Sequence, residues 1–289
     1  MLPSIRHSLL HHARLLSTAS TPRRIIRFRD GSGLEKLAHQ PEEGGPATLL
    51  TGSLLRPESL EDTGETVKWH KSFQLLRPID PPIILGTGLN YHKHAAECGL
   101  PVPDFPILAF VKPPSAAQHP HLPIMIPACC DLERPEVDWE VELAIVVGSG
   151  PGGRPCKSVT EEAALDYVLG YTAANDVSAR LWQTDPARTS GQWNRGKGFD
   201  TFCPLGPALV LQERDFDPHD LRISLTVNGE VMQDSNTNDL IFSVAQIVSF
   251  LSQDTTIAPG TVILTGTPCG IGMSRDPPQY LKPGDEVSA

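Results

Sequence analysis

The sequence predicts a mainly β fold with some α-helix, and three observations support this class. Proline (28 residues) and glycine (24 residues) are both frequent in the 289-residue chain, which favours short strands joined by turns. Asn228-Gly229 lies between Val227 and Glu230, and this dipeptide supplies the two positive φ angles of a tight hairpin turn. The strand-like apolar runs do not alternate regularly with helical patterns, so a doubly wound nucleotide-binding fold is not expected.

Short runs rich in Val, Ile, Leu and Phe mark the expected strands, which are 25–28, 83–86, 107–112, 140–147, 207–211 and 223–227. Longer helical patterns are fewer, and they lie at 161–168 and 244–252. Segment 24–78 is expected to form a small N-terminal domain. A proline cluster at 78–82 then interrupts both helix and central strand, so we expect the main domain at 79–289.

Residues 1–23 differ in composition from the rest of the chain. No acidic residue precedes Asp30, whereas six arginines do. On a helical wheel, leucines and Ile5 fall on one side and arginines and histidines on the other. Such a basic amphipathic segment is typical of a mitochondrial transit peptide, and the alternative is an ordinary disordered basic tail. The expected location is the mitochondrial matrix, with the cytoplasm as the alternative.

Bulk properties exclude several classes of partner. The net charge of −10 argues against nucleic acid, whose phosphates require a basic face. No apolar run approaches the 18 residues of a membrane span, so no membrane association is expected. The six cysteines form no CxxC pair, which favours reduced thiols over a zinc clamp. No phosphate-binding GxxxxGK[ST] loop and no GxSxG elbow is present.

The most informative segment is the apolar run around Asp138, Glu140 and Glu142. These acids alternate with Trp139, Val141 and other apolar residues, so on a strand they share one face at intervals of roughly 7 Å. Ionised carboxylates that face the same dry space repel one another and lose hydration. A hard divalent cation removes both penalties, and carboxylate ligands suit Mg²⁺, Mn²⁺ or Ca²⁺ rather than zinc. The alternative is a half-exposed face whose acids meet lysines or arginines of a neighbouring strand.

Four further segments carry polar residues that suit chemistry. His94 and Glu97 are i,i+3 neighbours on a helical turn and can share a proton, unless they belong to a mobile polar loop. Asp176 lies among small and apolar residues and either completes a three-carboxylate site or marks a turn. Lys197 lies between two glycines, where a backbone can approach a ligand closely. The segment 264–272 combines hydroxyls, tight turns and backbone donors that suit carboxylate or phosphate oxygens, or a structural loop.

Taken together, these segments resemble the fumarylacetoacetate hydrolase superfamily over residues 83–289. The matching motifs are Val137-Asp138-Trp139-Glu140-Val141-Glu142-Leu143, Asn175-Asp176-Val177-Ser178-Ala179-Arg180, the run from Gly196 to Pro207, and Thr265-Gly266-Thr267-Pro268. Three features resemble those of a mitochondrial subgroup of that superfamily, and they are Trp139, the leader and the run Phe202-Cys203-Pro204-Leu205-Gly206-Pro207. The resemblance implies a mixed β-sandwich roll of the fumarylacetoacetase C-terminal type, usually a homodimer.

The resemblance also implies a role for nine residues. It implies metal ligands that hold Mg²⁺ (or Mn²⁺, with Ca²⁺ as a further alternative), and these are Glu140, Glu142 and Asp176. The catalytic residues that it implies are His94, Glu97 and Lys197. The pair His94 and Glu97 would lie on a lid that orders when substrate binds. The substrate-binding residues that it implies are Arg180, Gln183 and Thr267.

The expected substrate is a small 2-keto dicarboxylic acid, which chelates the ion through its carboxylate and keto oxygens while an enolate develops. The subgroup favours enol-to-keto tautomerisation of oxaloacetate. The alternatives are hydrolysis of an acylpyruvate, decarboxylation of oxaloacetate, and a catalytically silent metal-binding scaffold.

Two features depart from the family pattern. Most relatives have Asp after the motif arginine, whereas this chain has Leu181, so local salt-bridging is expected to differ. Relatives also continue past the final Gly-Asp-Glu-Val with another strand, whereas this chain stops at Ala289. The alternatives are a truncated C-terminus or an incomplete strand pair with an exposed sheet edge.

Overall fold

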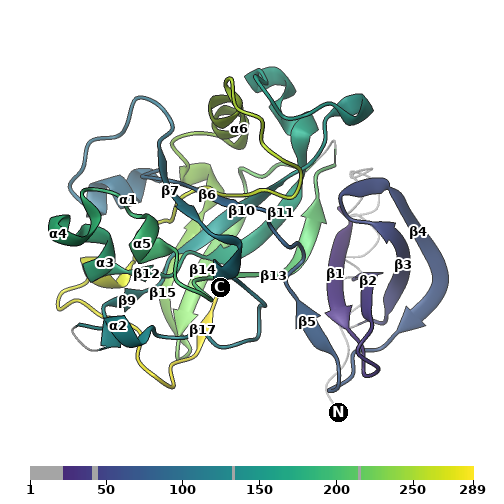
Figure 1. Cartoon of the computed structure of the whole chain (residues 1–289), viewed down its shortest axis with the longest axis horizontal. Coiled ribbons are helices and arrows are strands. Elements are labelled where there is room, and N and C mark those ends of the chain that lie inside the picture. The colour runs from purple at the N-terminus through teal and green to yellow at the C-terminus, as the bar shows by residue number, and fades with distance from the viewer. Residues whose placement is uncertain (1–21, 41–44, 132–133, 214–215) are drawn as a thin grey trace, which may run out of the picture.

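The computed structural model describes residues 22–40, 45–131, 134–213 and 216–289. The expected leader, 1–23, lies almost wholly outside the described residues. Figure 1 shows a sheet through the centre of the molecule, with short helices at one end and a curved group of N-terminal strands at the other. Every helix in the described ranges is too short or too polar to cross a bilayer.

The fold is built mainly from strands, as the sequence predicts. They are β1 (Arg24–Arg29), β2 (Glu35–His39), β3 (Ala47–Ser53), β4 (Arg56–Val67), β5 (Gln74–Leu76), β6 (Ile84–Thr87), β7 (Leu108–Lys112), β8 (Ala117–Gln118), β9 (Val137–Asp138), β10 (Val141–Val147), β11 (Val168–Asn175), β12 (Ser178–Ala179), β13 (Cys203–Leu211), β14 (Arg222–Val227), β15 (Glu230–Asn236), β16 (Val262–Leu264) and β17 (Val287–Ser288). The α-helices are α1 (His92–Glu97), α2 (Ala128–Asp131), α3 (Arg180–Thr184), α4 (Pro186–Thr189), α5 (Asn194–Lys197) and α6 (Val244–Ser252).

The main sheet is mixed. Its strand order is β4-β3-β2-β1-β13-β11-β10-β16-β6-β7, with β5 paired to β1 and β8 to β13. The β16–β6 and β13–β8 pairs are parallel and the other pairs in this sheet are antiparallel. The N-terminal strands join the rest through β1, where Arg24 is opposite Val210 of β13. The sheet therefore continues across the expected boundary near residue 78, and the separate N-terminal domain stays a prediction.

Strand β10 crosses the middle of the sheet and is buried along its whole length. Leu143, Ile145 and Val147 face one apolar core, whereas Ala144 and Val146 face the other. Full burial of a Leu, Ile or Val side chain contributes about 1.5–3 kcal/mol of stability relative to leaving it exposed. The two cores thus fix the register of β10 and, with it, the place of any polar side chain on the same strand.

Several expected elements are confirmed. The Asn228-Gly229 turn joins β14 to β15, and both residues have positive φ (53° and 80°). Helix α6 spans 244–252 as expected, and the Ser243 side chain caps it together with Gln246. The expected helix at 161–168 is instead a 3-10 helix, Glu161–Tyr167, because Val168 already begins strand β11.

The expected strand at 140–147 is also corrected, because it is interrupted. β9 ends at Asp138 and β10 begins at Val141. At the break, the Glu140 N–H donates to the Asn175 side chain (3.1 Å) and the Val141 N–H donates to the Gln233 side chain (2.8 Å). Side-chain acceptors replace the sheet ladder here, which ends the strict alternation of faces.

Candidate active site

Three carboxylates from different segments meet at the end of the β10–β11 pair. Glu142 lies on β10, Glu140 lies in the break before it, and Asp176 follows β11. Val141 is opposite Asn175 in the antiparallel register, which brings the three side chains together. One carboxylate oxygen from each residue lies within 4.8 Å of one from each of the other two, and all three residues are buried.

Arg180 and Lys197 bring positive charge to this carboxylate cluster. Arg180 Nη1 lies 2.7 Å from Glu140 Oε1, and Lys197 Nζ lies 2.7 Å from Glu140 Oε2. Lys197 also pairs with Asp176 Oδ2. Although burial opposes ionisation of Glu140, Lys197 and Arg180 lower its pKa, so this carboxylate is held in its charged form.

A second buried lysine, Lys112, holds the other oxygen of Asp176. Lys112 Nζ lies 2.6 Å from Asp176 Oδ1 and donates to three carbonyls, including that of Lys197 at 2.6 Å. Lys112 is not among the site residues predicted from the sequence. The signal that could have identified it is its position at the end of the apolar strand β7, directly before Pro113. No exposed charge is needed at that position.

Glu142 has no such partner among the described residues. The Gly266 N–H donates to Glu142 Oε2 at 2.6 Å. Burial raises the pKa of Glu142 well above its usual value, and the charges of Asp176 and Glu140 add to that effect. Burial likewise raises the pKa of Asp176, despite Lys112 and Lys197.

These observations fit a hard divalent cation. The donor set is oxygen only, the oxygens are close enough to share one ion, and the repulsion at Glu142 is the kind that an added cation relieves. Glu140, Glu142 and Asp176 are therefore the residues that could hold Mg²⁺ or Mn²⁺.

Asp138 does not join the cluster, although the sequence placed it on the same face. Its oxygens accept the N–H groups of Trp139, Gly272 and Met273 at 2.7–3.0 Å. Arg180 Nε and Nη2 both lie 2.8 Å from Asp138 Oδ2. Asp138 therefore fixes the position of Arg180, which in turn fixes that of Glu140. These ion pairs of Arg180 form although the next residue is Leu181 and not an aspartate.

His94 and Glu97 form a hydrogen-bonded pair on helix α1. His94 Nδ1 and Glu97 Oε2 are 2.8 Å apart. Burial lowers the pKa of His94, but hydrogen bonds with Cys98 and Glu97 outweigh it and raise that pKa to about 9. The charges of His94 and Glu140 also influence each other's pKa, so this pair and the carboxylate cluster belong to one electrostatic neighbourhood.

The loop 265–272 contacts both groups. Its Gly266 N–H donates to Glu142, and its Gly270 N–H donates to Glu97 Oε1 at 2.8 Å. Gly266 has φ +95°, and a Cβ there would come within 2.9 Å of the Asn90 Cβ, so a glycine is needed at this turn. One short loop thus positions an acid on β10 and an acid on α1.

The remaining predicted residues are buried and internally bonded. The Thr267 hydroxyl donates to the Val141 carbonyl (3.0 Å) and accepts from Gln233 Nε2 (2.8 Å). Gln183 accepts from Arg180 Nη1 at 2.8 Å. Contact of Thr267 or Gln183 with substrate stays a prediction. Gln233 was missed, and a lone glutamine on an exposed hairpin strand gave no signal for it.

The glycine before Lys197 has a packing role. A Cβ on Gly196 would lie 2.6 Å from the Gln183 backbone nitrogen. Gly196 therefore allows the close approach of α5 to α3, and the approach of a ligand to this backbone stays a prediction. This packing places Lys197 at the end of α5 with its ammonium in the carboxylate cluster.

Comparison with known proteins places this geometry in a family. Residues 83–289 match the family model described as fumarylacetoacetate (FAA) hydrolase C-terminal. The chain is 41% identical over 282 residues to a mitochondrial oxaloacetate tautomerase of Xenopus laevis, covering 94% of this chain and 83% of that protein. It is 48% identical over 207 residues to a mitochondrial oxaloacetate tautomerase of Bos taurus, covering 72% of this chain and 62% of that protein.

Solved structures of proteins from the same superfamily are also similar to this chain. A 2-hydroxyhepta-2,4-diene-1,7-dioate isomerase from Mycobacterium marinum matches with a TM-score of 0.73 and 35% identity over 92% of each chain. A fumarylacetoacetate hydrolase from Exiguobacterium antarcticum matches with a TM-score of 0.74 and 32% identity over 92% of this chain and 94% of that chain. The chain belongs to the fumarylacetoacetate hydrolase family and is an enzyme of that superfamily.

Proposed function

We propose that this enzyme is a Mg²⁺-dependent tautomerase that converts enol-oxaloacetate to its keto form. The observation that carries the proposal is the buried carboxylate cluster, in which Glu142 has no cationic partner among the described residues. The relatives from Xenopus laevis and Bos taurus that are named oxaloacetate tautomerases support the substrate.

Glu140, Glu142 and Asp176 would hold the ion, with Mn²⁺ as an alternative to Mg²⁺. When bound, the ion supplies positive charge beside the substrate oxygen on which negative charge develops. Lys197 adds a second fixed positive charge on the same side, because burial in the cluster and its two carboxylate partners orient its ammonium.

His94 would carry the proton in this reaction. Tautomerisation removes the proton from the enol hydroxyl and adds one at C3, so the product has the same composition as the substrate. The pKa of His94 is raised to about 9, which gives this imidazole a proton to deliver at neutral pH. Glu97 fixes the ring through Nδ1 and leaves Nε2 for the substrate.

Arg180 and Gln183 would act on substrate binding through the position of Glu140, and Thr267 through the loop 265–272. A homodimer and a mitochondrial matrix location are further parts of the proposal. The location is supported by the relatives named mitochondrial and by the basic composition of residues 1–23.

Acylpyruvate hydrolysis is the second candidate, because the solved relatives include a fumarylacetoacetate hydrolase. The same groups would serve it if His94 and Glu97 activated a water that attacks a carbonyl carbon. Decarboxylation of oxaloacetate is the third, and it differs by the release of pyruvate.

The test follows enol-oxaloacetate absorbance and pyruvate release together, using the full chain with Mg²⁺. Loss of the enol without pyruvate supports the tautomerase, and pyruvate in step with enol loss supports a decarboxylase. The variant His94→Gln should lose turnover while Mg²⁺ binding is kept. His92→Gln, an exposed histidine on the same helix, is the matched control. If the enol absorbance stays constant and no pyruvate is released, hydrolysis of an acylpyruvate is tested next. If that substrate is not hydrolysed either, a catalytically silent scaffold is the remaining candidate.

A further inference from the structure

We propose that His94, Glu97 and Cys98 form a second metal site, one that takes Zn²⁺ or a similar borderline cation and is separate from the carboxylate cluster. Binding there would switch off proton transfer by His94. The binding itself stands on the geometry of helix α1 alone, whereas the inhibition rests on the proposed function.

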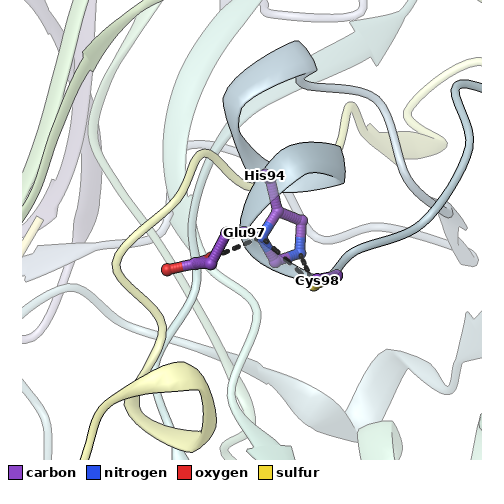
Figure 2. A group of neighbouring side chains, drawn as sticks. All are labelled: His94, Glu97 and Cys98. Carbon is purple, nitrogen blue, oxygen red and sulfur yellow. Dashed lines mark hydrogen bonds and ion pairs between the residues drawn. The ribbon is translucent and has the colours of Figure 1, made fainter.

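The three side chains meet because of their spacing. Positions 94, 97 and 98 are i, i+3 and i+4, so their side chains lie on one face of the helical turn. His94 and Glu97 belong to α1, and Cys98 is its C-terminal capping residue. Figure 2 shows the Glu97 carboxylate on one side of the His94 imidazole and the Cys98 sulfur on another. Each residue offers one ligand atom, and these atoms lie within 4.8 Å of one another.

The distances are close to those of a tetrahedral zinc site. Zn–N bonds of about 2.0–2.1 Å and Zn–S bonds of about 2.3 Å place nitrogen and sulfur about 3.6 Å apart. Cys98 Sγ lies 3.8 Å from His94 Nδ1 and 3.8 Å from Nε2. His94 Nδ1 and Glu97 Oε2 are 2.8 Å apart and need to separate by about 0.5 Å to reach a tetrahedral N···O edge. A cation at this place replaces the proton that the two groups share.

The donor set determines which metal binds. A thiolate, an imidazole nitrogen and a carboxylate oxygen suit zinc, and a water completes four-coordination. Mg²⁺ prefers oxygen alone, which is what the cluster of Glu140, Glu142 and Asp176 offers. The chain thus presents a hard site and a softer site of different chemistry within one electrostatic neighbourhood.

The second site is both held and accessible. The Gly270 N–H fixes Glu97 Oε1, which leaves Oε2 directed at His94. The side chains of His94 and Glu97 are 12% and 20% exposed, and Cys98 is exposed. A hydrated cation can therefore reach all three ligand atoms from solvent, and Cys98 releases its thiol proton as the metal–sulfur bond forms.

The consequence for turnover follows from the imidazole. A metal on His94 Nδ1 takes the place of the proton there, so the ring no longer forms the imidazolium that makes Nε2–H a proton donor. Zn²⁺ would then inhibit reversibly, and a chelator that leaves Mg²⁺ bound would restore activity. Cys98 also hydrogen-bonds His94, so inhibition by Zn²⁺ is compared, for each protein, with its own turnover in the absence of Zn²⁺.

The first experiment uses Co²⁺ as a spectroscopic substitute for Zn²⁺. Full-length protein is saturated with Mg²⁺, kept reduced, and titrated with Co²⁺ in the absence of substrate. A sulfur-to-cobalt charge-transfer band is expected in the wild type and should vanish in Cys98→Ser. Cys129→Ser is the matched control, because Cys129 is a partly exposed thiol outside this site, and the band should persist there. No band in the wild type, or a band that persists in Cys98→Ser, overturns the site.

The second experiment measures Zn²⁺ inhibition of turnover in the same proteins. The turnover of each protein without Zn²⁺ is the reference for its own inhibition, and thermal melting checks that Cys98→Ser is folded. Its half-inhibiting Zn²⁺ concentration should rise at least about tenfold, the smallest effect typical of removing even an outer partner of a metal ligand. Equal inhibition of wild type and Cys98→Ser overturns the inhibitory role. If the enzyme proves to have another activity, the cobalt spectrum still decides the site, so the two proposals fail separately.

Discussion

Glu140 and Glu142 lie two residues apart and both belong to the buried carboxylate cluster, but they have opposite electrostatic surroundings. Glu140 contacts Arg180 and Lys197, each at 2.7 Å, and these cations lower its pKa. Glu142 accepts the Gly266 N–H, and its pKa is raised by burial and by the neighbouring acids. Among the described residues, Glu142 is therefore the acid of the cluster that has no cation in contact with it.

This asymmetry predicts that Glu142→Gln has two effects of opposite sign. At neutral pH, ionised Glu142 costs stability in the metal-free protein, because its folded pKa lies above its unfolded value. Glutamine removes the charge and keeps an oxygen for the Gly266 N–H. The free energy of unfolding in chelator should therefore rise by about 1–3 kcal/mol.

Mg²⁺ affinity should fall in the same variant, because a ligand oxygen has lost its charge. A loss of more than about 100-fold is expected, since even outer partners of metal ligands contribute 10–100-fold. Chemical denaturation in chelator and calorimetric titration with Mg²⁺ measure the two effects. Glu230→Gln, on the exposed start of β15, is the control and should change neither. Unchanged Mg²⁺ affinity would remove Glu142 from the ligand set.

The sequence predicted the carboxylate cluster because its residues alternate on a strand or stand out among apolar neighbours. It predicted the His94–Glu97 pair because i,i+3 spacing is local. Both signals are short-range, and the hydrogen bond at 2.8 Å in α1 realises the second of them directly.

The sequence could not show which residues meet across the sheet. Lys112 reaches Asp176 from β7, 64 positions away along the chain, and Gln233 reaches the break at Val141 from the β14–β15 hairpin. The sequence predicted that Asp138 shares a face with Glu140 and Glu142. It could not show the break between β9 and β10, because that break depends on side chains from distant segments. Tertiary partners of this kind leave no periodic pattern in the residues that they contact.

Lys112 is predicted to stabilise the fold through Asp176. Lys112→Met keeps the apolar stem and removes the ammonium that lies 2.6 Å from Asp176 Oδ1. Breaking a buried ion pair by removing one partner typically costs about 3–5 kcal/mol, because the other charge stays buried. The urea midpoint should fall accordingly. Lys157→Met, at an exposed lysine, is the control and should leave the midpoint near wild type. A midpoint that moves no more than in this control would show that Lys112 is not needed to hold Asp176.

His94 is predicted to make stability depend on pH in the metal-free protein. Hydrogen bonds with Cys98 and Glu97 outweigh burial and raise the pKa of His94 from 6.5 to about 9. A group whose folded pKa is raised stabilises the fold fully below its unfolded pKa, and this contribution is lost as pH rises through the folded value. The free energy of unfolding, taken as wild type minus His94→Gln, should therefore decrease by about 1–3 kcal/mol between pH 6.5 and pH 9.

Denaturant unfolding in chelator across this range measures the difference, and His92→Gln on the same helix is the control, for which the difference should stay flat. A flat difference for His94→Gln as well would mean that folding does not raise the pKa of His94, so that most of the imidazole is neutral at pH 7. His94 would then have no proton to deliver to C3, and its proposed role would change from acid to base. The stability curve therefore tests the protonation state on which the proposed direction of proton transfer depends, without requiring any turnover.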